Sequence, residues 1–223
     1  MDIIVPKPRA VLFDWDDTVV SNWDIGVAAI NTTLVHMGME AWSEAEIRRR
    51  SGQSARDAFT ILFGEDRWQE ADRMYYTTFN KLAEERGQTL VPGIGDVFET
   101  LARAGVYMGV VSNKRGDLLR KDVARAGFTE FFGGIIGAGD AEFDKPDPAP
   151  VLLALKSSSV LPAPDVWFVG DSHTDMICAH KTGCSGMLIE TKTPPEDLLT
   201  PNMPARRFAD HVKFMEFIQG YFV

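Results

Sequence analysis

The stretch from Ala10 to Thr18 reads AVLFDWDDT, and it decides the fold of this chain. An apolar run without a polar interruption is typical of a strand buried on both faces, as in a parallel sheet covered by helices. Three acids, Asp14, Asp16 and Asp17, follow where such a strand ends. Neighbouring carboxylates repel one another, so the cluster indicates either a bound cation or good solvation.

Similar apolar runs recur along the chain, with helical patterns between them. They read VYMGVV from Val106, GIIG from Gly134, VWFV from Val166 and GMLI from Gly186. Strands that alternate with helices predict right-handed crossovers and a Rossmann-like α/β fold, with a doubly wound parallel sheet as its core. The tail from Pro194 is expected to be loop-rich before a last helix around residues 211–218.

The segment between the first two runs breaks this alternation. Residues 21–91 contain several helical patterns and no convincing strand, and Ser43 followed by Glu46 predicts a capping box at the start of one helix. We therefore expect residues 1–20 and 92–223 to form the α/β core. Residues 21–91 are expected to form a helical cap domain inserted between the first and second strands.

The charge balance excludes some classes of partner. The 223 residues include 32 acids against 23 lysines and arginines, which gives a formal net charge of -9. Such a surface repels nucleic acid and anionic membranes. No apolar run approaches the roughly 18 residues of a membrane span. We expect no nucleic-acid partner and no membrane association, and we expect the chain to act as a monomer or homodimer.

Cysteine content and the first residues bear on the compartment. Cys178 and Cys184 are too few for a framework of several disulfides, which favours a reducing compartment. The segment from Met1 to Pro6 has an acid where a secretory leader needs positive charge. These two observations predict a cytoplasmic location.

Polar residues follow the later runs as well. SNK occupies 112–114, GDSHTD occupies 170–175, and Lys145 stands between Asp144 and Pro146. Each group alone is common in turns and helix caps. The carboxyl ends of the strands in a doubly wound sheet meet at one edge, where ligands bind. Carboxylates, a hydroxyl and a lysine at that edge together favour a divalent metal and phosphate site.

In these four segments the chain resembles the haloacid dehalogenase superfamily of hydrolases. The segments are FDWDDT at 13–18, VVSNK at 110–114, KPDP at 145–148 and VGDSHTDM at 169–176. Their order and the helical insertion after the first segment are most similar to the phosphoglycolate phosphatase-like branch. The resemblance covers nearly the whole length.

The resemblance implies catalytic roles for several of these residues. Asp14 would attack phosphorus and form an aspartyl-phosphate intermediate. Asp16 would protonate the departing ester oxygen and then deprotonate the water that hydrolyses the intermediate. Ser112, Asn113 and Lys145 would bind the phosphoryl group.

The resemblance also implies a Mg²⁺ cofactor. Its ligands would be the carboxylates of Asp14 and Asp171 and the backbone carbonyl of Asp16, since Mg²⁺ prefers hard oxygen donors. Asp175, one helical turn after Asp171, would support the metal indirectly or through a water molecule.

Two further features concern the turn and the cap. Asp17 stands where the family usually has glycine, and we interpret it as a solvated turn residue. The basic stretch from Arg48 to Arg56 offers Gln53 and Arg56 as candidates for contact with a substrate carboxylate. Arginines favoured by the dipole at a helix end are an equally good interpretation.

The leading functional hypothesis is a Mg²⁺-dependent phosphatase that acts on a small phosphorylated metabolite, with phosphoglycolate the first compound to test. A β-phosphoglucomutase-like phosphoryl transferase is an alternative within the same resemblance, because such transferases have the same two acids at the positions of Asp14 and Asp16. A catalytically silent module that binds phosphate for regulation is an alternative from another class.

Overall fold

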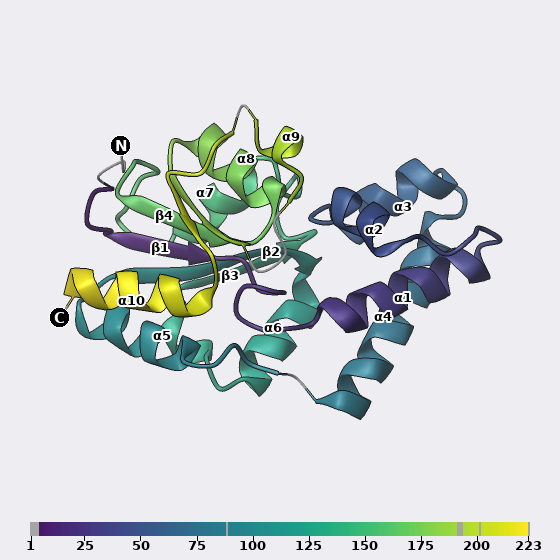
Figure 1. Cartoon of the computed structure of the whole chain (residues 1–223), viewed down its shortest axis with the longest axis horizontal. Helices are drawn as coiled ribbons and strands as arrows, with labels where there is room; N and C mark the ends of the chain where they lie inside the picture. Colours follow the sequence, from purple (N-terminus) through teal and green to yellow (C-terminus); the bar gives the residue numbers. More distant parts are fainter. Residues whose placement is uncertain (1–4, 88, 191–193, 201, 223) are drawn as a thin grey trace.

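A six-stranded parallel sheet forms the centre of the computed structural model, which describes residues 5–87, 89–190, 194–200 and 202–222. The strand order is β3-β2-β1-β4-β5-β6, so the predicted doubly wound α/β fold is confirmed (Figure 1). Residues 1–4, on which the interpretation of the leader rests, lie outside the described residues. The strands are β1 (Ala10–Phe13), β2 (Tyr107–Arg115), β3 (Gly134–Ala138), β4 (Val166–Gly170), β5 (Ser185–Ile189) and β6 (Arg206–Phe208).

Helices cover both faces of the sheet, and β1 shows why its sequence is apolar throughout. Val11 and Phe13 belong to the larger hydrophobic cluster, which includes residues of α5, α6 and α10. Ala10 and Leu12 belong to a second cluster, with α7 and α8. Successive side chains of a strand point to opposite faces, so a strand covered on both sides needs apolar residues at every position. The covering helices are α5 (Ile94–Arg103), α6 (Gly116–Arg125), α7 (Ala149–Leu155), α8 (His173–Thr182) and α10 (His211–Phe222).

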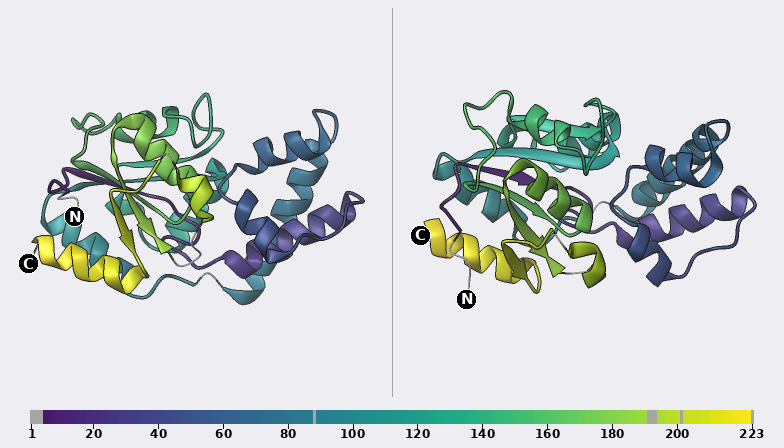
Figure 2. Two further views of the ribbon diagram at one scale, coloured as in Figure 1. Left: turned by 45° about the horizontal axis from the view of Figure 1, so that its top comes forward. Right: turned by 90° about the horizontal axis from the view of Figure 1, so that it is seen from above.

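Four helices follow β1 and form a separate lobe beside the sheet (Figures 1 and 2). They are α1 (Trp23–His36), α2 (Glu44–Arg50), α3 (Ala55–Phe63) and α4 (Trp68–Arg86). The predicted capping box is present at α2, where the Ser43 hydroxyl accepts from the Glu46 N–H and the Glu46 carboxylate accepts from the Ser43 N–H. The two longest helices of the lobe, α1 and α4, pack against each other.

Two short segments connect this lobe to the sheet, and they pair with each other. Val20 and Leu90 form an antiparallel bridge. The Ser21 N–H donates to the Thr89 carbonyl at 2.8 Å, and the Val91 N–H donates to the Val19 carbonyl at 3.0 Å. The chain therefore leaves and re-enters the core at adjacent positions, which lie beside the bounds that the sequence predicts for the cap.

Some elements differ from the expectations. The tail contains the short helix α9 (Glu196–Leu199) and the edge strand β6, where only loops were expected. The strand β6 pairs in parallel with β5, but its RRF sequence has no apolar run that would mark it. The strand β2 continues past the apolar run to Arg115 and carries Ser112 with it. Among the described residues, no helix combines the length and the apolar character that a membrane span requires.

Candidate functional site

The acid cluster lies where the order of the sheet reverses direction. Phe13, the last residue of β1, pairs with Val110 on one side and Val169 on the other. The Asp14 N–H continues this pairing and donates to the Val169 carbonyl at 2.8 Å. The chain runs from β1 to β2 on one side and from β4 to β5 on the other, so the loops that follow β1 and β4 separate and leave room for a ligand.

Lys145 forms buried ion pairs with an acid that follows β1 and with an acid in α8. Its Nζ lies 2.8 Å from Asp14 Oδ1 and 2.7 Å from Asp175 Oδ1, and all three side chains are largely buried. Burial, opposed by the charge of Lys145, raises the pKa of Asp14 to about 7. Burial also disfavours the charged form of Lys145, but attraction to Asp14 and Asp175 outweighs it and raises the pKa of Lys145. The lysine thus carries a positive charge beside the Asp14 carboxylate.

Asp175 holds this lysine from the first turn of α8. Its Oδ2 accepts from the Ser172 hydroxyl at 2.6 Å and from the Ser172 N–H at 3.1 Å, which completes a capping box. A Cβ at Gly170 would lie only 2.3 Å from the same oxygen, so the close approach of Asp175 to β4 requires glycine at that position. Both oxygens of Asp175 are engaged by protein donors, which suits a residue that positions Lys145.

Two residues to which the sequence analysis gave no role hold Asp16. Asn22 Nδ2 donates to Asp16 Oδ1 at 2.8 Å, and Lys114 Nζ lies 3.1 Å from the same oxygen. Lys114 is also 2.5 Å from Asp122 Oδ2, and its side chain is only 3% exposed. Burial opposes its charge, but Asp16 and Asp122 outweigh that effect and raise the pKa of Lys114.

Lys114 is therefore part of the site. The signal in the sequence was its spacing from Ser112. Alternate residues of a strand point to the same side, so Lys114 lies on the side of Ser112 once β2 extends to Arg115.

Ser112 and Asn113 have different surroundings. Ser112 is buried and lines the cavity described below. The Asn113 carboxamide binds backbone, because its Nδ2 donates to the carbonyls of Gly52 and Lys145 and its Oδ1 accepts from the Lys145 N–H. The Asn113 side chain therefore connects the loop that contains Lys145 to the cap. The expected phosphate contacts of both residues stay predictions.

Asp17 occupies a left-handed backbone conformation, which glycine adopts more easily than other residues. Its φ is +63°, in the left-handed region that side chains disfavour. Its carboxylate accepts from the Asn22 N–H at 3.0 Å, and its own N–H donates to the Val20 carbonyl at 2.6 Å. A short acid that bonds locally tolerates this region better than most residues.

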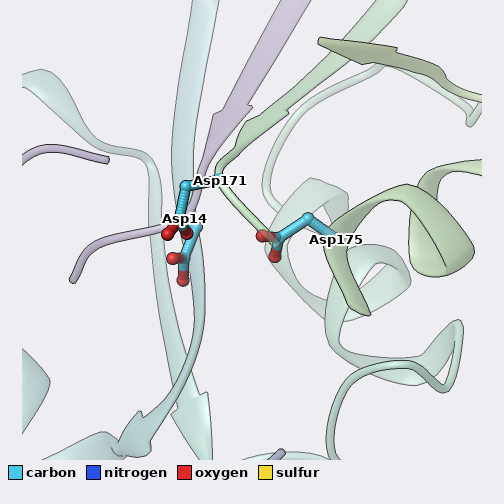
Figure 3. A group of neighbouring side chains, drawn as sticks. All are labelled: Asp14, Asp171 and Asp175. Carbon is cyan, nitrogen blue, oxygen red and sulfur yellow. The ribbon is translucent and has the colours of Figure 1, made fainter. Parts of the chain in front are cut away.

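Three carboxylates fit a divalent cation. Asp14, Asp171 and Asp175 each offer an oxygen within 4.8 Å of the others (Figure 3). Figure 3 shows the carboxylates of Asp14 and Asp171 beyond neighbouring strands, with Asp175 reaching toward them from α8. These are the hard oxygen donors that Mg²⁺ prefers. The expected ligands Asp14 and Asp171 lie together. The Asp16 side chain is directed to Asn22 and Lys114, and ligation by the Asp16 backbone carbonyl stays a prediction.

A cavity of about 260 Å³ opens above these acids and extends into the cap. Asp14, Asp16, Asp171 and Ser112 line its core end. Of the two cap residues singled out from the sequence, Gln53 lines the cavity. The Arg56 guanidinium lies 5.9 Å from the centre of the Trp68 ring, and Arg56 is not among the described lining residues. Substrate contact by either stays a prediction.

The cap is closed onto the core in this structure. Besides the Asn113 contact with Gly52, the Arg115 N–H donates to the Tyr76 hydroxyl at 3.1 Å. The Lys114 Nζ lies 4.5 Å from the centre of the Phe79 ring, and Arg49 pairs with Asp197 at 2.7 Å. The helices α2 and α4 and the loop after α2 therefore contact the sheet edge that carries the acids.

Comparisons with known proteins agree with this arrangement. The model of the haloacid dehalogenase-like hydrolase family matches residues 11–189. A phosphoglycolate phosphatase of Yersinia pestis is 31% identical over 183 residues, 79% of this chain and 78% of that protein. Pyrophosphatase PpaX of Bacillus pumilus is 28% identical over 196 residues, 88% of this chain and 89% of that protein. A superfamily hydrolase structure from Ehrlichia chaffeensis is 26% identical, with a TM-score of 0.65 over 98% of this chain and 99% of that one.

Proposed function

The chain belongs to the haloacid dehalogenase-like hydrolase family, and from this premise we propose that it is a Mg²⁺-dependent phosphatase acting on a phosphate monoester of a small metabolite. One observation carries the proposal. Asp14 lies in contact with Lys145 beneath a cavity, and Asp16 lines the same cavity two residues further on. Phosphoglycolate is the first compound to test, because a relative of similar length carries the name of its phosphatase.

Asp14 supplies the nucleophile in this proposal. A bond forms between its carboxylate oxygen and phosphorus as the bond from phosphorus to the ester oxygen breaks. Lys145 contacts Asp14 at 2.8 Å, so its charge favours the ionised nucleophile and offsets negative charge on the transferring group. The Ser112 hydroxyl donates to a phosphoryl oxygen.

Asp16 moves the proton in both half-reactions. It donates a proton to the departing ester oxygen, so the alcohol leaves neutral. It then removes a proton from the water that attacks phosphorus, and this attack releases phosphate and regenerates Asp14. Asn22 and Lys114 hold one oxygen of Asp16, which leaves its other oxygen for this work.

Mg²⁺ fits beside Asp14 and Asp171, and when bound it supplies positive charge that offsets the charge of the phosphate. The closed cap limits the access of water to the intermediate. A small phosphorylated metabolite is the proposed partner, and the net negative charge of the chain disfavours nucleic acid. The cytoplasmic location and a monomeric or homodimeric state stay predictions.

Phosphate release tests the proposal. Purified protein is given phosphoglycolate, pyrophosphate, sugar phosphates and other monoesters, each with Mg²⁺ and with EDTA. We expect Mg²⁺-dependent release from at least one monoester, and loss of this release in Asp14→Asn. The matched control is Asp66→Asn, an exposed acid of the cap, which should keep the wild-type rate.

Two outcomes would overturn the proposal. An isomerised sugar phosphate formed without free phosphate would identify a phosphoryl transferase. No release from any monoester, with Asp14→Asn indistinguishable from wild type, would identify a silent binding module.

A further inference from the structure

The cap end of the cavity is lined mostly by apolar side chains. The cavity begins at Asp14 and Asp16 and continues between α1, α3 and α4. Its wall there includes Val27 and Ile30 from α1 and Phe59 and Leu62 from α3. Part of this wall is needed for packing, but these side chains also border open space that connects to the catalytic acids.

Positive charge in the cavity is concentrated at the core end and already paired. Lys145 lies between Asp14 and Asp175, and Lys114 lies between Asp16 and Asp122. Among the described lining residues, Arg50 is the one cation that the cap contributes.

Arg50 does not make the cap end of the cavity, which we call the cap chamber, a site for a buried anion. It is exposed at the end of α2, and its guanidinium lies 4.6 Å from the centre of the Trp42 ring. A carboxylate on the leaving group would lose its hydration in the chamber without a buried cation to receive it, and that transfer is costly.

We propose, on the basis of the phosphatase function above, that the preferred substrate is a phosphate monoester of an uncharged, predominantly apolar alcohol. Its phosphoryl group lies at Asp14 and its hydrocarbon body lies in the cap chamber. The size agrees with this assignment, because a dry apolar cavity of about 150 Å³ accommodates a benzene ring. The 260 Å³ here leaves room for such a body beside a phosphoryl group.

A matched pair of substrates tests the charge preference. Isobutyl phosphate and phosphoglycolate have leaving groups with the same number and branching of heavy atoms, but one ends in two methyl groups and the other in a carboxylate. With Mg²⁺ and wild-type protein, we expect kcat/KM for isobutyl phosphate to exceed that for phosphoglycolate by about tenfold or more.

A chain-length series tests the hydrocarbon contact. From ethyl to propyl to butyl phosphate the leaving alcohols are chemically alike, so differences in kcat/KM report contact with the wall. Each buried methylene should raise kcat/KM by about fourfold until the chamber is full. Ala58 lines the chamber from α3, and Ala58→Leu should move the optimum to a shorter chain. Thr60→Leu, on the same helix but not among the lining residues, should leave the optimum unchanged.

The outcomes separate this inference from the proposed function. If the esters release phosphate in an Asp14-dependent manner but kcat/KM is flat along the series, or phosphoglycolate is the better of the pair, the phosphatase function stands and the apolar preference is wrong. If no ester releases phosphate, the proposed function fails, and the inference that rests on it fails as well.

Discussion

Asp16 is held from both sides of the boundary between core and cap. Asn22 precedes the first cap helix, and Lys114 lies one residue before the end of β2, the strand beside β1. The Phe79 ring of the cap packs against the same lysine at 4.5 Å. The position of Asp16, the proposed proton donor, is therefore linked to the position of the cap through one buried cation.

Replacing that cation should affect the chemical step. We expect Lys114→Met to lower kcat by about ten- to hundredfold with little change in KM, because Asp16 loses a partner that orients it while the phosphate contacts remain. Steady-state kinetics on the best monoester measures this, and Lys114→Arg should restore part of kcat. Lys121→Met, an exposed lysine of α6, is the control. An unchanged kcat in Lys114→Met would contradict the positioning role.

The positive φ of Asp17 gives a second prediction at this scale. Asp17→Ala keeps the disfavoured backbone and loses the hydrogen bond from the Asn22 N–H, whereas Asp17→Gly loses the bond but relieves the backbone. We expect the alanine variant to be less stable than the glycine variant by about 1–2 kcal/mol. Urea denaturation measures the difference. Equal stabilities would show that this turn carries no such strain.

The acids of the site could be predicted from their position after apolar runs, whereas the residues that hold them could not. Asp14 and Asp171 directly follow β1 and β4, and Lys145 lies in the loop before α7, so a short sequence window reveals the element beside each of them. Asn22 contacts Asp16 only because the chain turns tightly after Asp14, and Lys114 contacts it only because β2 lies beside β1. The spacing of Lys114 from Ser112 indicates the side of β2 on which Lys114 lies, but a short window does not show which residue of a neighbouring strand or turn it contacts.

At the scale of elements, the loop after α2 governs how the cap meets the core. Gly52 has a φ of +94°, and its carbonyl accepts from Asn113. A Cβ at Gly52 would lie 2.5 Å from Thr174 Oγ1 and 3.2 Å from Ser172 Oγ. Glycine here meets two requirements at once, a left-handed backbone and a close approach to α8.

A pair of glycine variants separates those requirements. Gly64, also in the cap, has a φ of +75°, and a Cβ there would meet nothing within 4 Å. Gly52→Ala and Gly64→Ala should both lose about 1–2 kcal/mol of stability from backbone strain. Only Gly52→Ala should also lose about ten- to hundredfold in kcat/KM, because it holds the cap away from the core. Thermal denaturation and kinetics together test this, and equal activities would refute the close-approach argument.

At the scale of the whole molecule, the metal should link the site to global stability. A ligand that binds only the folded state at a hundred times its Kd stabilises by about 2.7 kcal/mol. For a chain of this length we expect saturating Mg²⁺ to raise Tm by about 5–10 °C. Asp171→Asn should remove most of that rise, and the exposed control Asp66→Asn should keep it. A full rise in Asp171→Asn would exclude Asp171 as a ligand.

The first five strands of the sheet could be predicted from the sequence, whereas the edge strand β6 could not. Five strands read as apolar runs, so their alternation with helices predicts the sheet, and three of them, β1, β4 and β5, are buried at every position. The sixth, β6, is short and contains two arginines, and only its pairing with β5 makes it a strand. The contact between cap and core could not be predicted from the sequence either. It depends on hydrogen bonds between segments far apart in the chain, such as the one from Asn113 to the Gly52 carbonyl.

The paired segments at Val20 and Leu90 have a consequence for how such a molecule changes over time. The two segments pair with each other as the two sides of a hairpin do, and the cap takes the place of the hairpin loop. The connection between β1 and β2 is therefore closed at its base, whatever residues the cap contains. Insertions at surface connections are tolerated for this reason. A lineage can therefore remodel, enlarge or exchange the lobe that meets the leaving group while it inherits the catalytic carboxylates unaltered.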